Sequence, residues 1–408
     1  MKKMKRMLAV ILSIVMVLSM AACGSDSKKE KKEEKKDQDY FTVVQDSQSM
    51  KSGKVEMEMS LKVEDSANTL KTYLGTDTVK VKAEFDDDSE SETDGKMVLS
   101  VDYDGTGYKE FTDIIIKDQT TYINTKKMVS VILPLVKKYA GENVPSTLNE
   151  EMVNAMIGGD YISITEEELK TLMEQSADTV EDDTVDNGTT MLDIVTDTEK
   201  MQKYMEAYQA VAADKIAEMV KGVKPAVLGQ DGENYTFTVN AENLTPFMDA
   251  FKELVKNDGE KLVAEFADKL KESVGEDDMV YKTVSDKESV KKYIDELVKG
   301  LEEQDYTSVI EAKPEFVSKV GLQGEEGSRE ATQDFTVKFA DTESKTNVEM
   351  GISCKVTEGK AEAVSAPTES VVSVTELMNN LGALSGADTS DVDTADDADI
   401  DDVENSGL

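Results

Sequence analysis

Histidine and tryptophan are absent from this chain of 408 residues, and cysteine occurs only twice. Without histidine, the chain cannot build a Ser–His or Cys–His nucleophile or any imidazole acid–base pair. The usual soft ligands of zinc and copper are missing as well. Two carboxylates alone can hydrolyse a glycoside. This chain has so many acidic residues, however, that the sequence identifies no particular pair as catalytic. We therefore expect a protein that is not an enzyme, with no catalytic residue, no metal and no cofactor.

Basic residues are few compared with acidic ones. There are 46 Lys and Arg against 85 Asp and Glu, a formal net charge of −39, which becomes −43 without the four basic residues at the start of the chain. This charge argues against nucleic acid, and against anionic lipid headgroups, as partners of the folded body. The composition names no protein partner.

Residues 1–22 have the pattern of a secretory signal. Four basic residues among the first six precede an uncharged apolar run from Met7 to Ala22. A membrane-spanning helix needs about 20 apolar residues, and this run is shorter. We therefore expect a cleaved signal rather than a permanent span.

The signal ends in SMAACG, residues 19–24, which resembles the lipobox of bacterial lipoproteins except that Met20 stands where leucine is usual. The resemblance implies that the Cys23 thiol carries a diacylglyceryl group and becomes the first residue after cleavage. Residues 23–39 then form a charged tether, because they contain no large apolar side chain to bury. The expected location is the outer face of the bacterial cytoplasmic membrane, with the membrane itself as a partner through this lipid.

Three segments between residues 54 and 103 alternate strictly between apolar and polar side chains. They are KVEMEMSLKV, TVKVKAEF and KMVLSVDY, and this period is typical of strands with one wet face. Polar residues 117–120 separate two further β-rich runs and predict the tip of a hairpin. The region 54–128 is thus predicted to be an antiparallel meander.

Helical periodicity follows from Val129 and dominates the second half of the chain. Long amphipathic helices are predicted at 196–222, 244–273 and 285–302, strands at 334–339, 347–356 and 360–367, and a helix at 371–381. The expected fold class is α+β, with a curved, half-barrel-like antiparallel sheet packed against amphipathic helices. The predicted segments are 40–177, an acidic connection at 178–192, and 193–384 with strands that return to the same sheet or form a second one.

The tail at 385–408 is acidic and poor in apolar residues, so we expect it to be disordered. It lacks the glycine turn and terminal glutamate of a calcium loop, which favours a solvated tail over a calcium site. Residues 55–63, VEMEMSLKV, resemble residues 348–356, VEMGISCKV. This likeness indicates either a duplicated half or two strands in similar positions, and it places Cys354 on the apolar side as a small hydrophobic residue.

The order of these elements resembles the half-barrel lipoproteins of the lipoprotein-carrier superfamily. The likeness covers about residues 40–175 and the strands at 334–366, through segments such as SMKSGKVEMEMSLKV and GKMVLSVDYDGTGYKEFTDIIIKDQTTYIN. It implies one curved antiparallel sheet wrapped around helices, with an apolar concavity that accepts acyl chains. The long helices at 196–302 depart from the compact members, so the protein's own helices could fill that concavity.

Apolar side chains on the inward faces form a candidate ligand wall. Its members are Met57, Met59, Leu61, Val81, Met97, Leu99, Val101, Ile114, Ile116, Met350 and Ile352. The plain alternative is that each belongs to an ordinary core covered by helices. We expect first a non-enzymatic lipoprotein that binds a lipid or another apolar molecule, next a structural or protein-interaction lipoprotein with a filled core, and then a solute-binding protein of an importer.

Overall fold

The computed structural model describes residues 39–48, 50, 52–87, 94–141, 145, 147–169, 171, 198–341, 345–359, 363–368 and 370–385. The fold class is α+β, as predicted from the sequence. One open sheet has the strand order β12-β6-β5-β4-β3-β2-β1-β11-β10-β9-β8-β7, and its strand pairs are antiparallel except β12 with β6. The chain divides into two compact units.

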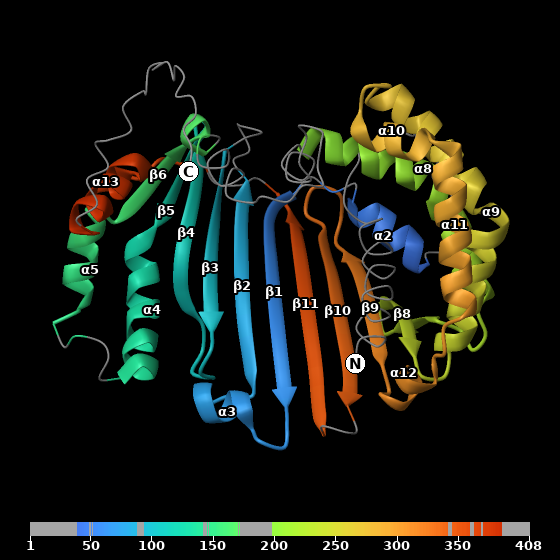
Figure 1. Ribbon diagram of the computed structural model, residues 1–408, viewed down its shortest axis with the longest axis horizontal. Coiled ribbons are helices and arrows are strands. Elements are labelled where there is room, and N and C mark those ends of the chain that lie inside the picture. Colours follow the sequence, from blue (N-terminus) through green and yellow to red (C-terminus); the bar gives the residue numbers. More distant parts are fainter. Residues whose placement is uncertain are drawn as a thin grey trace, which may run out of the picture. The chain divides into compact units, whose positions relative to one another are not determined.

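The first unit contains residues up to Phe111 and from Val180 to Val364. Its strands are β1 (Ser52–Glu64), β2 (Thr78–Asp87), β3 (Gly95–Asp102), β7 (Leu228–Asp231), β8 (Asn234–Asn240), β9 (Glu315–Gln323), β10 (Glu330–Asp341) and β11 (Thr346–Glu358). Its helices are α2 (Tyr40–Gln48), α3 (Thr69–Leu74), α8 (Thr198–Gly222), α9 (Leu244–Ser273), α10 (Met279–Ser285), α11 (Lys287–Glu302) and α12 (Thr307–Glu311) (Figure 1).

The second unit contains residues Thr112–Thr179 and Ser365–Leu408. Most of β4 (Lys109–Lys117) belongs to it, with β5 (Thr120–Asn124), β6 (Tyr161–Thr165) and β12 (Val371–Ser373). Its helices are α4 (Thr125–Ala140), α5 (Glu150–Ile157) and α13 (Val374–Ser385). Asp118 and Gln119 have φ values of 50° and 62° between β4 and β5, which confirms the hairpin tip predicted at 117–120.

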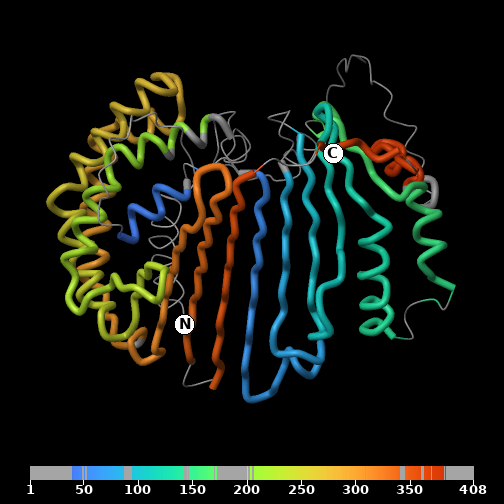
Figure 2. The backbone as a smooth tube through the Cα atoms, turned by 180° about the vertical axis from the view of Figure 1, so that it is seen from behind, coloured from blue at the N-terminus to red at the C-terminus, as the bar shows by residue number. Residues whose placement is uncertain are grey.

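The two segments that resemble each other in sequence are neighbouring strands. β1 pairs with β11 in antiparallel register, with Val55 opposite Val356 and Val63 opposite Val348. Figure 2 shows the blue and red-orange strands side by side, although almost 300 residues separate them in the chain. The returning strands therefore complete the sheet begun by the first ones, and the two similar segments occupy adjacent positions in it.

Helices cover one end of the apolar sheet face in the first unit. Phe316 of β9 and Phe237 of β8 are almost completely buried against Leu244 and Phe247 of α9. Val43 of α2 belongs to the same cluster. Burial of a large apolar side chain contributes about 2 kcal/mol or more, so this cluster is the main stabilising core of the unit.

Buried polar groups join four elements of the second unit. The carboxylate of Asp113 on β4 accepts hydrogen bonds from Asn124 Nδ2 at 3.0 Å and Tyr161 OH at 2.7 Å, and Lys127 Nζ lies 2.7 Å away. The Asp113 side chain is only 4% exposed. Since a buried carboxylate must be paired, this network fixes β4, β5, β6 and α4 together.

Several sequence predictions differ from the structure at element boundaries. The strand predicted at 360–367 is wrong, because residues 363–367 have no regular structure. Strand β9 was not predicted, and the helix predicted at 371–381 begins as strand β12 before α13. The connection at 178–192, the tether and most of the tail lie outside the described residues, as does Cys23.

Candidate apolar binding face

Nine of the eleven candidate wall residues lie on four adjacent strands, β11, β1, β2 and β3, and point to one side of the sheet. Met59 is opposite Val81 on β2 and Ile352 on β11, and Val81 is opposite Val101 on β3. Side chains at two-residue spacing share a face of a sheet. The other five members on this side are Met57, Leu61, Met97, Leu99 and Met350. We call these nine residues the apolar face.

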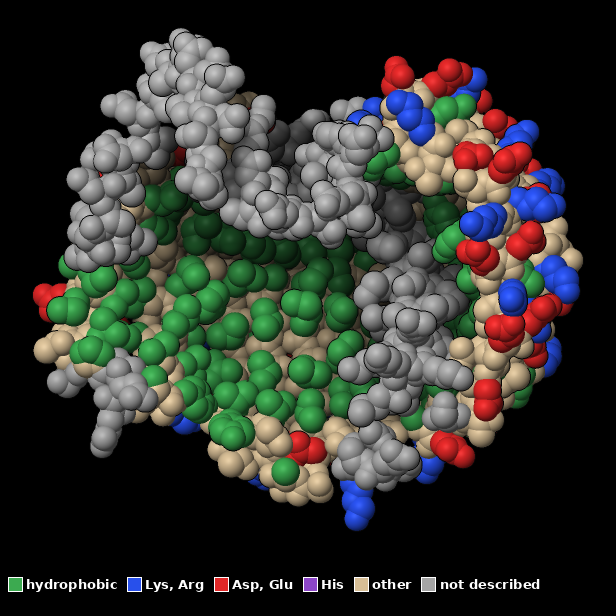
Figure 3. Space-filling view, viewed as in Figure 1, with side chains coloured by type: hydrophobic (Ala, Val, Ile, Leu, Met, Phe, Trp, Pro, Cys, Tyr) green, Lys and Arg blue, Asp and Glu red, His purple; other side chains and the backbone are tan. Residues whose placement is uncertain are grey.

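Exposure rises along the sheet from the helix-covered strands to the apolar face. Val337 on β10 is 1% exposed, its neighbour Met350 on β11 is partly buried against the core, and Leu61 and Met59 on β1 are 40% and 44% exposed. In the described part of the chain, α2 packs on β8 and β9, and α9 on β8. Figure 3 shows hydrophobic side chains spread over the strands beside these helices. The apolar face is therefore partly open to solvent.

Ile114 and Ile116 belong to the second unit. They pair with Ile123 and Thr121 on β5, while Ile115 between them is buried on the other side of β4. The structure thus brings nine candidate residues together in one unit and places these two in the other.

The apolar face contrasts with the opposite side of the same strands. There, Lys54 Nζ lies 3.2 Å from Glu84 Oε1, and Lys82 Nζ lies 3.4 Å from Glu56 Oε2. Burial raises the pKa of Glu84, but hydrogen bonds from Lys54 and Lys82 outweigh it, so the pKa stays below its ordinary value. Charges of both signs on the outer side keep it hydrated, and they leave the apolar face free of charge along its length.

An ion pair lies where β10 and β11 meet the end of the apolar face. Glu358 continues the alternation of Cys354 and Val356 along β11, and its carboxylate pairs with Arg329. These side chains are 9% and 18% exposed. Hydrogen bonds from Arg329 hold the pKa of Glu358 at about 2. Sequence reasoning missed this pair, although Arg329 is the only arginine after Arg6 and could have drawn attention.

Phe335 and Phe339 of β10 were also absent from the predicted wall. They lie on the same side as Ile352 and Val348 of β11 and pack against the core. The alternation in DFTVKF was visible in the sequence, but the position of β10 between the core and the apolar face was not.

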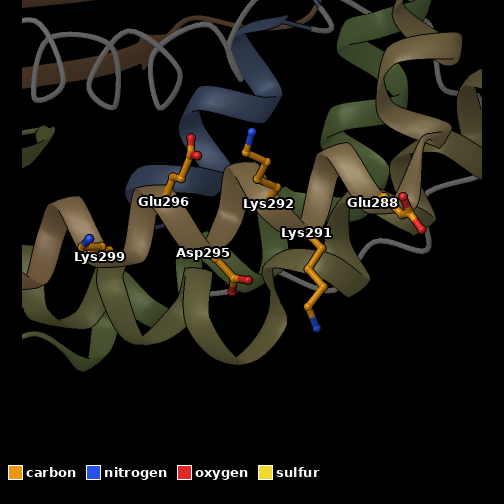
Figure 4. Close-up of a pocket in the computed structure, with 6 residues that line it drawn as sticks. All are labelled: Glu288, Lys291, Lys292, Asp295, Glu296 and Lys299. Carbon is orange, nitrogen blue, oxygen red and sulfur yellow. The ribbon is translucent and has the colours of Figure 1, made fainter.

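Two further hollows in the described residues are lined largely by charged side chains. A shallow one follows α11 and is lined by Glu288, Lys291, Lys292, Asp295, Glu296 and Lys299. Figure 4 shows Lys292 and Glu296 on one side of the helix, with Lys291 and Asp295 on the other. A second lies at the ends of β1, β10 and β11, where Lys62, Glu64 and Lys338 mix with Phe339. Mixed charges on exposed side chains select no ligand.

Metal binding finds no support in the described part of the chain. No group of three or more acidic or cysteine side chains there is placed to hold an ion. No helix among the described residues combines the length and the apolar character needed to cross a membrane.

Comparisons with known proteins give no relative for this chain. No family model matches it, and neither a curated protein nor a solved structure is significantly similar. The likeness to half-barrel lipoproteins remains a prediction from the sequence, and function has to be argued from the apolar face.

Proposed function

We propose that this protein is a lipid-anchored extracytoplasmic lipoprotein that binds acyl chains on its apolar face. The observation that carries the proposal is the exposure of Met59 and Leu61 on β1, while the same side of β8, β9 and β10 is buried in the core with helices. A contiguous, partly open apolar surface of a folded unit often marks a binding site.

The chemistry of the apolar face suits a hydrocarbon chain. Its nine members are methionine, leucine, isoleucine and valine, which offer no directed hydrogen bond for a polar ligand. Methionine side chains adapt to ligands of varied shape. Each buried methylene contributes about 0.8 kcal/mol, so about eight buried methylenes would contribute roughly 6 kcal/mol before the cost of association.

The expected anchor supports the same function. A diacylglyceryl group at Cys23 would hold the protein beside a membrane, where acyl lipids are the abundant apolar molecules. The core of helices over β8, β9 and β10 fills only one end of the sheet in the described residues, which leaves the apolar face available.

Titration with a dansyl-labelled fatty acid tests the proposal. The chain from Gly24 to Leu408, which keeps every described residue, should enhance and blue-shift the dansyl emission in a saturable way. Met59→Glu places a charge in the middle of the apolar face and should weaken binding at least tenfold, since a charge resists transfer into apolar contact.

Ser60→Glu is the matched control. Ser60 follows Met59 directly, faces the opposite side of β1 and stands across from Gly351 of β11. This variant adds the same charge to the hydrated side, and it should bind the probe as the unchanged chain does. Equal weakening by both variants, or no saturable binding at all, would reject the proposal and leave an interaction protein with a filled core.

A further inference from the structure

Helix α4 of the second unit has a charge opposite to that of the protein as a whole. Its sequence, TKKMVSVILPLVKKYA, contains four lysines and no acidic residue. Lys126 lies 2.8 Å from Asp160, and Lys127 lies 2.7 Å from the buried Asp113. Lys137 and Lys138 stand in the last turn, where both are exposed.

An apolar stripe runs along the exposed part of the same helix. Ile132, Val136 and Tyr139 are 41%, 40% and 47% exposed. Their spacing of four and three residues places them on one side of the helix. Val131 and Leu133, on either side of Ile132 around the helix, are buried. They attach α4 to the unit, while the apolar stripe remains exposed to solvent. Figure 3 shows hydrophobic side chains over α4 of Figure 1.

We propose that α4 docks on the surface of an anionic lipid bilayer. Ile132, Val136 and Tyr139 enter the boundary between headgroups and acyl chains, and Lys137 and Lys138 contact the headgroups. A helix with apolar residues on one side and lysines beside them has the pattern of an interfacial helix. Tyrosine suits this depth because its ring is apolar and its hydroxyl stays wet. Lys138 Nζ lies 5.1 Å from the centre of the Tyr139 ring. The positive charge and the aromatic ring would therefore contact the same region of the bilayer surface.

The negative charge of the whole chain does not oppose this contact at close range. At physiological salt the Debye length is about 8 Å, so acidic residues farther from α4 are screened. α5 packs against α4 and begins with Glu150 and Glu151, so we assign the contact to α4 alone. The proposal differs from acyl-chain binding on the apolar face, because it concerns the other unit and a bilayer surface.

The absence of tryptophan from the sequence permits a direct test. Tyr139→Trp gives a single emitter on α4, and Tyr293→Trp, at a position 68% exposed on α11, gives its control. The chain from Gly24 to Leu408 is mixed with vesicles of phosphatidylglycerol and phosphatidylcholine. The Tyr139→Trp emission should shift to the blue and be quenched by brominated acyl chains, and the Tyr293→Trp emission should stay unchanged.

Charge and specificity are tested on the same probe. Lys137→Ala and Lys138→Ala should each weaken partitioning about fivefold, the effect expected for one basic residue near an anionic surface. Met59→Glu should leave docking unchanged, which separates bilayer docking from acyl-chain binding.

Ile132→Trp serves as a second probe if Tyr139→Trp alters the circular dichroism spectrum. An unshifted emission from both probes in folded protein would overturn the proposal and leave the stripe to a protein partner. Equal partitioning into pure phosphatidylcholine would overturn it as well.

Discussion

The guanidinium group of Arg329 donates two hydrogen bonds to the carboxylate of Glu358, from Nε to Oε2 at 3.0 Å and from Nη2 to Oε1 at 2.8 Å. The backbone N–H groups of Gly327 and Arg329 donate to the same carboxylate. This pair therefore closes the turn between β9 and β10 onto the end of β11. Bidentate pairs with little exposure are stronger than ordinary surface ion pairs.

Replacing the carboxylate of Glu358 should destabilise the first unit. Glu358→Gln should lower the free energy of unfolding by about 2 kcal/mol, the usual worth of hydrogen bonds to a charged group. Urea unfolding measures the change. Lys319→Ala is the control, because Lys319 pairs at 2.7 Å with Asp231, whose side chain is 69% exposed. That variant should change stability far less, because exposed ion pairs contribute little, and an equal loss in both variants would contradict the expected difference.

The same pair predicts a pH dependence. The pKa of Glu358 is about 2 in the folded protein, below its ordinary value of 4.5, so the unfolded chain takes up the proton first as pH falls. The contribution is complete above pH 4.5 and is lost as pH falls toward 2. The stability difference between the unchanged protein and Glu358→Gln should therefore shrink through this range. A difference that stays constant from pH 6 to pH 3 would argue against the pair.

Tyr40 should anchor α2 on the sheet. Its hydroxyl donates a hydrogen bond of 2.8 Å to Ser318 Oγ on β9, and burial raises the pKa of Tyr40 to about 12. Tyr40→Phe and Ser318→Ala should each cost about 1 kcal/mol or more, since each leaves a buried partner unsatisfied. The double variant should cost less than the sum, measured as a double-mutant cycle. Strict additivity would show that the two hydroxyl groups do not interact.

Asp113 should be essential to the second unit. Asp113→Asn keeps the size of the side chain but removes the charge that pairs with Lys127 and changes an acceptor of the Tyr161 hydroxyl. Hydrogen bonds to a charged group contribute about 2 kcal/mol, so weakening this buried acceptor should lower the free energy of unfolding by about that amount. Hydrogen exchange should rise in residues 112–165 and change little in β8 and β9. Tyr161→Phe removes the hydrogen bond from the Tyr161 hydroxyl but keeps the Asp113 charge and its pairing with Lys127, so its effect should be smaller. Unchanged exchange in Asp113→Asn would reject this role.

Core and apolar face should respond differently to substitution. Phe316→Ala removes a fully buried ring and should destabilise by about 3–5 kcal/mol. Met59→Ala, at a side chain 44% exposed, should cost much less. Thermal unfolding compares the two directly. A loss of several kcal/mol at Met59 would show that this position is packed like a core.

The sequence predicted those parts of the fold whose signals are local. Alternation located β1, β2, β3, β10 and β11, and helical periodicity located α8, α9 and α11. Strand β9 escaped because polar Ser318 is buried between Phe316 and Val320 on one side, while apolar Val317 lies on the other side, which blurs the alternation. The segment 360–367 had the composition of a strand, but its described residues, 363–367, form none.

The sequence predicted the residues of the apolar face, but it did not predict how far their side chains are exposed to solvent. Alternation identifies which side chains share a face, as it did for Met57, Met59 and Leu61. Whether helices cover that face depends on contacts between distant segments, and β10 separates the covered strands from the open ones. The Arg329–Glu358 pair likewise needs two strands to meet at one end. Such features arise from tertiary structure, and no periodicity reports them.

Native mass spectrometry of the chain from Gly24 to Leu408, purified from a bacterial host, is the decisive test of acyl-chain binding. We expect a population with the added mass of an acyl lipid, whose identity organic extraction confirms. This population should disappear in Met59→Glu and Leu99→Glu but persist in Ser60→Glu, provided that all three are folded by circular dichroism. A bare protein mass that takes up no lipid on incubation would contradict acyl-chain binding on the apolar face.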